Sequence, residues 1–316
     1  MEEFVPGVKI KVIGVWQGWC NFVDKMISEW LEGVDFVAIG TDTQNLAIKL
    51  ADKKINIGLN LSINFIGFWT WANIEIGRKA AEEHEHEIKE MLKDTDMVFI
   101  TCGTGWWTGG GAAPVIATIA KGMGILTVGI ITTPFSFEWE KRVMNSEEGV
   151  KKIKEAVDTL IVSSDDKIFN IIDKETTFKQ AFTMIDKIPY LLVQWISDLL
   201  VKPWDITIEF NDIKWMMKDS GDWWIWIGYG LWKDRVMKAT KWAIENFLLY
   251  GDLHKAKHII LSVTGWNDLN PAEIKEGFST LEDIIGEQIP CMWCSVFDKS
   301  YKDKVKVTII WTWIGE

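Results

Sequence analysis

Short apolar runs alternate with amphipathic stretches along the first half of the chain. The runs are rich in β-branched residues, as in buried strands, and the stretches between them carry apolar residues at helical spacing. In chain order these segments are residues 8–15, 20–31, 34–39, 75–93, 97–101, 112–122, 126–131, 147–157 and 159–162. The alternation predicts an α/β fold with a doubly wound parallel sheet. In such sheets the loops after the strands converge on one crevice, where ligands bind.

The second half begins with one long apolar stripe. Residues 177–202 fit a single helix, in which Pro189 is expected to cause a bend or a break because an interior proline costs about 3 kcal/mol or more. The later segments predict helices at 211–218, 234–246 and 271–285, and strands at 223–227, 259–263, 292–297 and 305–311. We therefore expect a first α/β domain at 1–176, a connecting helix at 177–202 and a smaller α/β domain at 203–316.

The stretch FITCGTGWWTGGGAAP, at residues 99–114, concentrates the candidate chemistry. Its glycines are predicted to form a loop between the strand and a helix that begins near Ala112: Gly103, Gly105, Gly109, Gly110 and Gly111. Glycine tolerates positive φ and lets backbone N–H groups approach a ligand, and the helix N-terminus adds partial positive charge. The pattern favours a phosphate-binding loop, with a tight turn that binds nothing as the alternative.

Composition narrows the class of protein. The 316 residues are 48% hydrophobic and 25% charged, as in ordinary globular proteins, and the net charge of −11 disfavours nucleic acid as a partner. The acidic start, MEEFVPGVKIKV, does not resemble a signal peptide, and no apolar run reaches the roughly 18 residues of a membrane span. We expect a cytoplasmic protein without direct membrane insertion.

The cysteines predict neither disulfides nor a metal site. Cys20, Cys102, Cys291 and Cys294 are too few and too scattered for a disulfide scaffold. Cys291 and Cys294 have CxxC spacing, but they lie in a strand-like apolar run with no second pair nearby. We expect reduced thiols packed in the core.

Several segments, in a fixed order, resemble the tubulin-like cell-division GTPase family FtsZ. TGWWTGGGAAP is similar to the family's signature loop GGGTGTGAAP. The other similar segments are KVIGV at 11–15 followed by Cys20 and Asn21, ANIEIGRKAAEE at 72–83, TTPFSFE at 132–138, ISDLLVKP at 196–203, KDSG at 218–221 and IGYG at 227–230. The resemblance implies a Rossmann-like GTP-binding domain, a central helix, a second α/β domain and head-to-tail assembly of copies into filaments.

The resemblance also implies which residues would bind the phosphates of GTP or GDP and the accompanying Mg²⁺. The β- and γ-phosphates would lie against Gly105, Thr108, Gly109, Gly110 and Gly111. The α-phosphate and ribose side would follow Gly18, Cys20 and Asn21. Asp42 and Gln44 match the loop that approaches phosphate and magnesium, while Ala72 and Asn73 match the loop that closes over the γ-phosphate.

Ribose and base contacts follow from the same resemblance. The matching positions are Glu138 and Arg142 for ribose, Phe182 for packing on guanine, and Asn21 and Asp186 for reading guanine. Asp165 stands where the family has asparagine. An ionised carboxylate accepts hydrogen bonds but cannot donate one to guanine O6, so base selectivity stays open.

Hydrolysis in this family needs an acidic loop from the neighbouring subunit, which here corresponds to residues 203–212. Asp212 matches the family, whereas Glu209 replaces an aspartate and Thr207 replaces an asparagine. A carboxylate can polarise water, but a misplacement of about 1 Å can cost about a hundredfold in rate. Glu209 and Asp212 are therefore the candidate catalytic residues, with weak or absent activity expected; a solvated acidic loop is the alternative.

Tryptophan is unusually abundant, and most of the 20 indoles stand where the family has glycine. Those in the expected nucleotide loops are Trp16, Trp19, Trp69, Trp71, Trp106, Trp107 and Trp139; others are Trp195, Trp204, Trp226, Trp266 and Trp313. Where glycine had positive φ or lay against phosphate, an indole is strained or fills ligand volume. Impaired nucleotide binding is expected. The run 223–226 predicts either an exposed adhesive patch or a buried strand.

Two other functions compete with an FtsZ-like GTPase. A designed or heavily mutagenised sequence could keep only the architecture, as a nucleotide-free structural protein. A dinucleotide-dependent oxidoreductase is disfavoured because no G-x-G-x-x-G follows the first strand. The chain ends at Gly315 and Glu316, so we expect no carboxyl tail of the kind that binds division partners in FtsZ. The family resemblance implies copies of the chain itself as partners.

Overall fold

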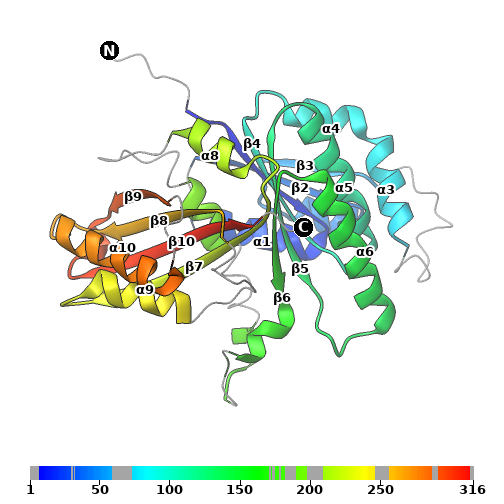
Figure 1. The fold of residues 1–316 in the computed structure, drawn as a ribbon. Helices are drawn as coiled ribbons and strands as arrows, with labels where there is room; N and C mark the ends of the chain where they lie inside the picture. The colour runs from blue at the N-terminus through cyan, green and yellow to red at the C-terminus, as the bar shows by residue number, and fades with distance from the viewer. Residues whose placement is uncertain are drawn as a thin grey trace, which may run out of the picture. The chain divides into compact units, whose positions relative to one another are not determined.

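The computed structural model describes residues 7–29, 31, 33–58, 73–170, 172, 175–177, 179–181, 190–197, 209–245, 256–286 and 291–313. The chain divides into two compact units, Met1–Val201 and Lys202–Glu316. Both units mix helices and strands (Figure 1), which confirms the predicted α/β class. Of the expected helix at 177–202, residues 177, 179–181 and 190–197 belong to the described part, and Pro189 lies outside it.

The first unit is built on a parallel sheet. Its strands are β1 (Ile10–Val15), β2 (Val34–Gly40), β3 (Lys53–Asn56), β4 (Met97–Gly103), β5 (Leu126–Thr133) and β6 (Thr159–Ser164). They lie in the order β3-β2-β1-β4-β5-β6, and every pair is parallel. The order reverses between β1 and β4, so the carboxyl ends of these two strands form the switch point at which such sheets bind ligands.

Helices follow the strands of this unit. They are α1 (Gln17–Ser28), α2 (Thr43–Ala47), α3 (Ile74–Glu83), α4 (Glu85–Leu92), α5 (Trp107–Gly122), α6 (Glu140–Ala156) and the 3₁₀ helix η2 (Asp165–Asn170). Helix α5 packs between α3 and α6 (Figure 1). Its apolar face, with Ala112, Ile116 and Ala120, joins a core cluster with Ile100 of β4 and Ile131 of β5. That packing fixes the start of α5 beside the strand ends.

The expected helix boundaries were partly wrong. Helix α5 begins at Trp107 rather than near Ala112, so the three consecutive glycines lie inside it. The expected helix at 75–93 is two helices that meet at His84, and α6 begins at Glu140 rather than at 147. The short elements α2 and β3 were not predicted.

The second unit is a mixed four-stranded sheet with helices. Its elements are α8 (Phe210–Met217), β7 (Gly221–Leu231), α9 (Arg235–Glu245), β8 (His258–Gly265), α10 (Pro271–Ile285), β9 (Cys291–Phe297), η4 (Lys299–Tyr301) and β10 (Lys304–Trp313). The strand order is β7-β10-β8-β9, with β10 antiparallel to β7 and β8, and β8 parallel to β9. Helices α9 and α10 lie against each other (Figure 1).

Indoles fill the core of the second unit. Trp223, Trp226 and Trp311 are at most 3% exposed, and the Trp224 ring stacks on that of Trp311 with centroids 5.6 Å apart. The run 223–226 is therefore part of a buried strand, and the expectation of an exposed adhesive patch there was wrong. No helix in the described ranges is long and apolar enough to cross a bilayer.

Candidate functional site

The loops after β1, β4, β5 and β6 meet around a cavity of about 270 Å³. Its lining consists of Trp16, Gly18, Trp19, Phe22, Gly103, Thr104, Gly105, Trp106, Thr132, Pro134, Arg142 and Asp165. A second cavity, of about 40 Å³, lies at the end of β2 and is lined by Trp16, Cys20, Gly40, Thr41, Asp42, Asn45, Leu46 and Lys49. Trp16 is the residue shared by the two linings, so its indole forms part of the wall of both.

Trp16 has a backbone conformation that glycine normally adopts. Its φ of 81° and ψ of 156° fall in a region that is essentially restricted to glycine and that costs another residue about 1–3 kcal/mol. The indole lies over Gly18, because a side-chain carbon at Gly18 would be 2.7 Å from Cζ3 of Trp16. The expected strain of an indole at a glycine position is thus present at Trp16, whereas Trp106 has an ordinary φ of −111°.

The Trp16 ring continues into a stack across the larger cavity. It stacks on Trp106 with centroids 5.3 Å apart and ring planes 22° apart. The guanidinium carbon of Arg142 lies 4.6 Å from the centroid of the Trp106 ring, within the range of a cation–π contact. Two indoles and a guanidinium therefore line the space that the strand ends enclose. Trp107, next in sequence, is not part of this lining.

Two helices begin at this cavity, and no side chain caps either start. Trp16 and Trp106 are the N-cap residues of α1 and α5, and neither makes a side-chain capping hydrogen bond. The first amides of a helix lack partners within the helix and carry partial positive charge, which suits an anion. Thr108, in the first turn of α5, is buried, and its Oγ1 has no hydrogen-bond partner within the described part of the chain.

The three glycines of α5 allow close packing of the backbone. A side-chain carbon at Gly109, Gly110 or Gly111 would lie 2.3, 2.8 and 2.1 Å from the carbonyl oxygens of Gly103, Thr104 and Ile74, respectively. Among described glycines, only Gly33, Gly124, Gly221 and Gly286 have positive φ. Gly109, Gly110 and Gly111 therefore do not use the positive φ that glycine tolerates. Glycine is needed there because α5 begins directly against the end of β4 and the start of α3.

Arg142, which lines the larger cavity, forms an ion pair with Glu138. Glu138 accepts a hydrogen bond from Arg142 Nη1 and another, 3.0 Å long, from the backbone N–H of Phe135. Gly105 lies against Arg142, since a side-chain carbon there would be 2.7 Å from Arg142 Cγ. Asp165 lines the same cavity at the start of η2. The structure thus brings together Gly18, Gly105, Arg142 and Asp165 in one lining.

A buried lysine that the sequence pattern did not indicate borders the smaller cavity. Lys49 is 7% exposed; its Nζ donates to Asn21 Oδ1 and lies 3.7 Å from Asp24 Oδ2. Cys20 lines the same cavity, and burial raises the pKa of its thiol to about 12, so the sulfur stays protonated. Lys49 was missed because its stretch, AIKLADKK at 47–54, is rich in charged residues and indicates a segment exposed to solvent.

Two other predicted residues cap helices. Asp42 Oδ1 accepts the N–H groups of Gln44 at 2.9 Å and Asn45 at 3.1 Å, at the start of α2. Asn73 Oδ1 accepts the N–H of Glu75 at 3.1 Å, at the start of α3. Gln44 is exposed. Ala72, Phe182 and Asp186 lie outside the described residues.

The two candidate catalytic residues belong to the second unit, where they form a capping box. Glu209 is the N-cap of α8, and its backbone N–H donates to Asp212 Oδ2 at 3.2 Å while its own side chain accepts from the backbone of Asp212. Their carboxylates therefore stabilise the start of α8. Across the described ranges, no group of three or more His, Cys, Asp or Glu side chains could hold a metal ion.

Comparison with known proteins gives a consistent result. A model of the Tubulin/FtsZ family GTPase domain matches residues 9–173, and a model of the FtsZ family C-terminal domain matches residues 221–315. A mutant of FtsZ from M. jannaschii is 34% identical, with 98% of this chain and 92% of that chain covered and a TM-score of 0.87. An empty FtsZ dimer from M. jannaschii is also 34% identical, with 98% and 89% covered and a TM-score of 0.85.

More distant structures share the fold. CetZ2 from Haloferax volcanii, a GTPγS-bound protofilament, is 16% identical, with 98% of this chain and 94% of that chain covered and a TM-score of 0.81.

Proposed function

Because this chain belongs to the tubulin/FtsZ family of GTPases, we propose that its first unit binds GTP or GDP in the cavity at the ends of β1, β4 and β5. One observation carries the proposal: two helices, α1 and α5, begin at that cavity without side-chain caps. Their first amides would bind the phosphates, and the buried Thr108 Oγ1 would gain a partner.

We propose further that the indoles weaken this binding. The Trp16 ring covers Gly18 at the start of α1, and its stack with Trp106 occupies space between the two helix starts. The larger cavity, at about 270 Å³, falls below the roughly 300–1,000 Å³ of typical ligand pockets. Nucleotide would therefore enter only when the Trp16 side chain turns away, and that step opposes binding.

Mg²⁺ would arrive with the nucleotide. Magnesium sites that serve phosphates commonly use one or two carboxylates together with phosphate oxygens and water. Asp42 is the candidate carboxylate, and its Oδ2 is available because its Oδ1 accepts both capping hydrogen bonds of α2. The phosphates would supply most of the remaining ligands, which fits the lack of a metal cluster among the described side chains.

Assembly with copies of the same chain is the proposed route to hydrolysis. The related structures include an FtsZ dimer and a CetZ2 protofilament, which supports self-association. We propose that the assembly is a cytoplasmic filament of the cell-division type. Glu209 and Asp212 of one copy would polarise water at the nucleotide of the next. Both carboxylates already serve as helix caps, so we expect slow hydrolysis.

The stacked indoles also favour a second candidate, a nucleotide-free structural protein with this architecture. In that case the rings of Trp16 and Trp106 occupy the cavity at all times, and the chain does not bind GTP.

Isothermal titration calorimetry with Mg²⁺ separates the two candidates. GTP binding with one site per chain and a Kd of about 10 μM to 1 mM supports the proposal, and no heat at millimolar GTP supports the structural protein. ATP serves as the control for base selectivity, because Asp165 can accept a hydrogen bond from either base. Sedimentation with and without GTP then tests assembly.

A further inference from the structure

We propose that the second unit contains a small-molecule site, between α10 and β9, that takes a planar apolar acid such as an aromatic carboxylate. The site is independent of the nucleotide cavity, since every residue that lines it belongs to the second unit. It is a cavity of about 450 Å³ lined by Leu269, Pro271, Ile274, Lys275, Phe278, Trp293, Ser295 and Phe297. That volume lies within the range of ordinary ligand pockets.

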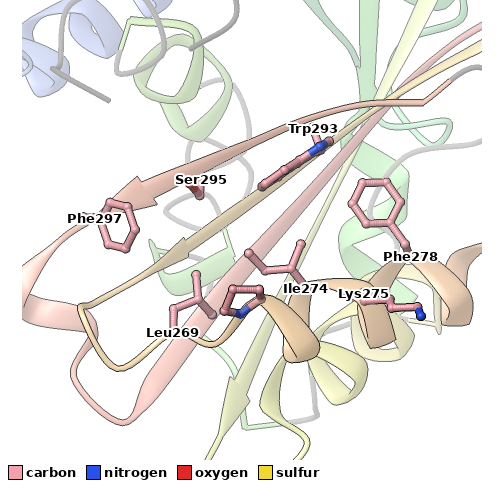
Figure 2. A pocket seen from close by; sticks show the side chains of 8 residues that line it. Leu269, Ile274, Lys275, Phe278, Trp293, Ser295 and Phe297 are labelled. Carbon is pink, nitrogen blue, oxygen red and sulfur yellow. The ribbon is translucent and has the colours of Figure 1, made fainter. Parts of the chain in front are cut away.

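Three aromatic side chains border the cavity. Figure 2 shows Trp293 and Phe297 on the strand and Phe278 on the helix, around a space that also borders Leu269 and Ile274. The rings of Phe278 and Trp293 meet edge to face with centroids 6.3 Å apart, and Phe297 is 40% exposed. Such ring faces and edges favour stacking with a flat apolar ligand.

The elements that carry these side chains are firmly anchored. Helix α10 begins with a capping box between Asn270 and Glu273 and ends at Gly286, whose φ is 77°. Strand β9 is paired with β8 from Cys291 to Phe297. A binding site on such elements needs little reorganisation, which lowers the free-energy cost of binding.

The cavity has one charged lining residue, Lys275, and the charge selects an anion. Lys275 is exposed, and no carboxylate of the described residues lies within ion-pair distance of it. The nearby Arg235, by contrast, is bound to both Asp268 and Glu273. An ammonium beside an apolar cavity suits a carboxylate attached to a ring.

The dimensions of the cavity favour a compact ligand over a polypeptide. The lining of α10 beyond Pro271 runs from Ile274 to Phe278, which is little more than one helical turn. An extended strand or an amphipathic helix needs a groove several turns long, because its anchors recur at i, i+3, i+4 and i+7.

The test uses 2-naphthoate and its neutral analogue 2-naphthamide with the full chain and no nucleotide. Calorimetry should show one site per chain for naphthoate with a Kd at or below about 1 mM. Lys275→Met should weaken naphthoate about fivefold and leave naphthamide unchanged, since an exposed ion pair contributes about 1 kcal/mol at most. Lys302→Met, which removes another exposed lysine of the same unit, should change neither.

A second variant and a local probe test the apolar part. Phe297→Ala, at an exposed position, should weaken both ligands about tenfold without unfolding the unit. With ¹³C-methyl-labelled isoleucine, the Ile274 resonance, assigned from Ile274→Val, should shift with naphthoate, whereas that of Ile13 in the first unit should not. Absence of binding at about 1 mM, an unmoved Ile274 signal, or equal effects of Lys275→Met and Lys302→Met would overturn the proposal.

Discussion

The same residue type has opposite consequences in the two units. In the second unit, Trp226 and Trp311 lie in a closed core, where their rings supply volume between the sheet and α9. In the first unit, Trp16 and Trp106 line a cavity at the strand ends, where a ligand would need the room. An indole stabilises the fold where packing is required, and we propose that it competes with the ligand where the fold leaves space.

The largest effect expected from this comparison is on the core of the second unit. Trp311→Ala should lower its free energy of unfolding by about 3–5 kcal/mol, because the variant removes a ring that is 1% exposed and touches both Trp224 and Trp226. Urea unfolding followed by far-ultraviolet circular dichroism measures this. The control Trp215→Ala removes an indole that is 68% exposed and should change stability by about 0.5 kcal/mol or less. A similar loss in both variants would contradict the assignment of Trp311 to the core.

Two acidic residues of the second unit, Glu209 and Asp212, cap helix α8 and are also the proposed catalytic residues, so variants can separate the two roles. Glu209→Ala should cost about 1 kcal/mol of stability through loss of the α8 cap. Asp212→Asn keeps an oxygen that can accept the Glu209 N–H, so stability should hold while GTP hydrolysis by assembled protein falls. Thermal unfolding and phosphate release are the two measurements. Unchanged hydrolysis in Asp212→Asn would assign this residue to capping alone.

Replacing Trp16, which lines the cavity, should change the free energy of unfolding far less than replacing Trp311, which lies in the core. Trp16→Gly relieves about 1–3 kcal/mol of backbone strain. It loses a stack worth about 0.5–1.5 kcal/mol and adds chain entropy to the unfolded state. These terms nearly cancel, so denaturant unfolding should place the variant within about 1 kcal/mol of the parent. A loss above about 3 kcal/mol would mean that Trp16 is a core residue.

The smallest expected effect is on the pH dependence of the unfolding free energy, through Asp268 of the second unit. Hydrogen bonds from Arg235 lower the pKa of Asp268. A lowered carboxyl pKa contributes stability above the ordinary aspartate value and loses it as pH falls through the lowered pKa, that is, below about pH 4. Arg235→Met should therefore flatten the dependence of unfolding free energy on pH in that range. An unchanged slope would show that the Asp268 pair contributes nothing measurable, because the aspartate is partly exposed.

The sheet of the first unit and the strands of the second were predictable because buried strands are continuous apolar runs. Strand β3 was missed because its sequence, KKIN, has a single apolar residue, and α2 was missed because five residues are too few for a helical period. The start of α5 was misplaced because glycine disfavours helices in isolation, whereas close packing against β4 and α3 overrides that preference here.

The candidate site was predictable only in outline. The glycine-rich stretch and family resemblance located the crevice, and four predicted residues, Gly18, Gly105, Arg142 and Asp165, line it. The family resemblance led us to expect strain at Trp16, whereas its place between two cavities and the burial of Lys49 depend on tertiary contacts that no local pattern encodes.

The most direct test of the claim that Trp16 limits nucleotide binding is a calorimetric titration of GTP and Mg²⁺ into Trp16→Gly and the parent. Trp139→Gly is the matched control, because Trp139 is also an N-cap residue of the first unit but is 64% exposed and lines neither cavity. We predict that Trp16→Gly tightens the Kd for GTP about tenfold or more, while Trp139→Gly stays within about twofold of the parent. Equal affinities in all three proteins, or weaker binding in Trp16→Gly, would contradict the account.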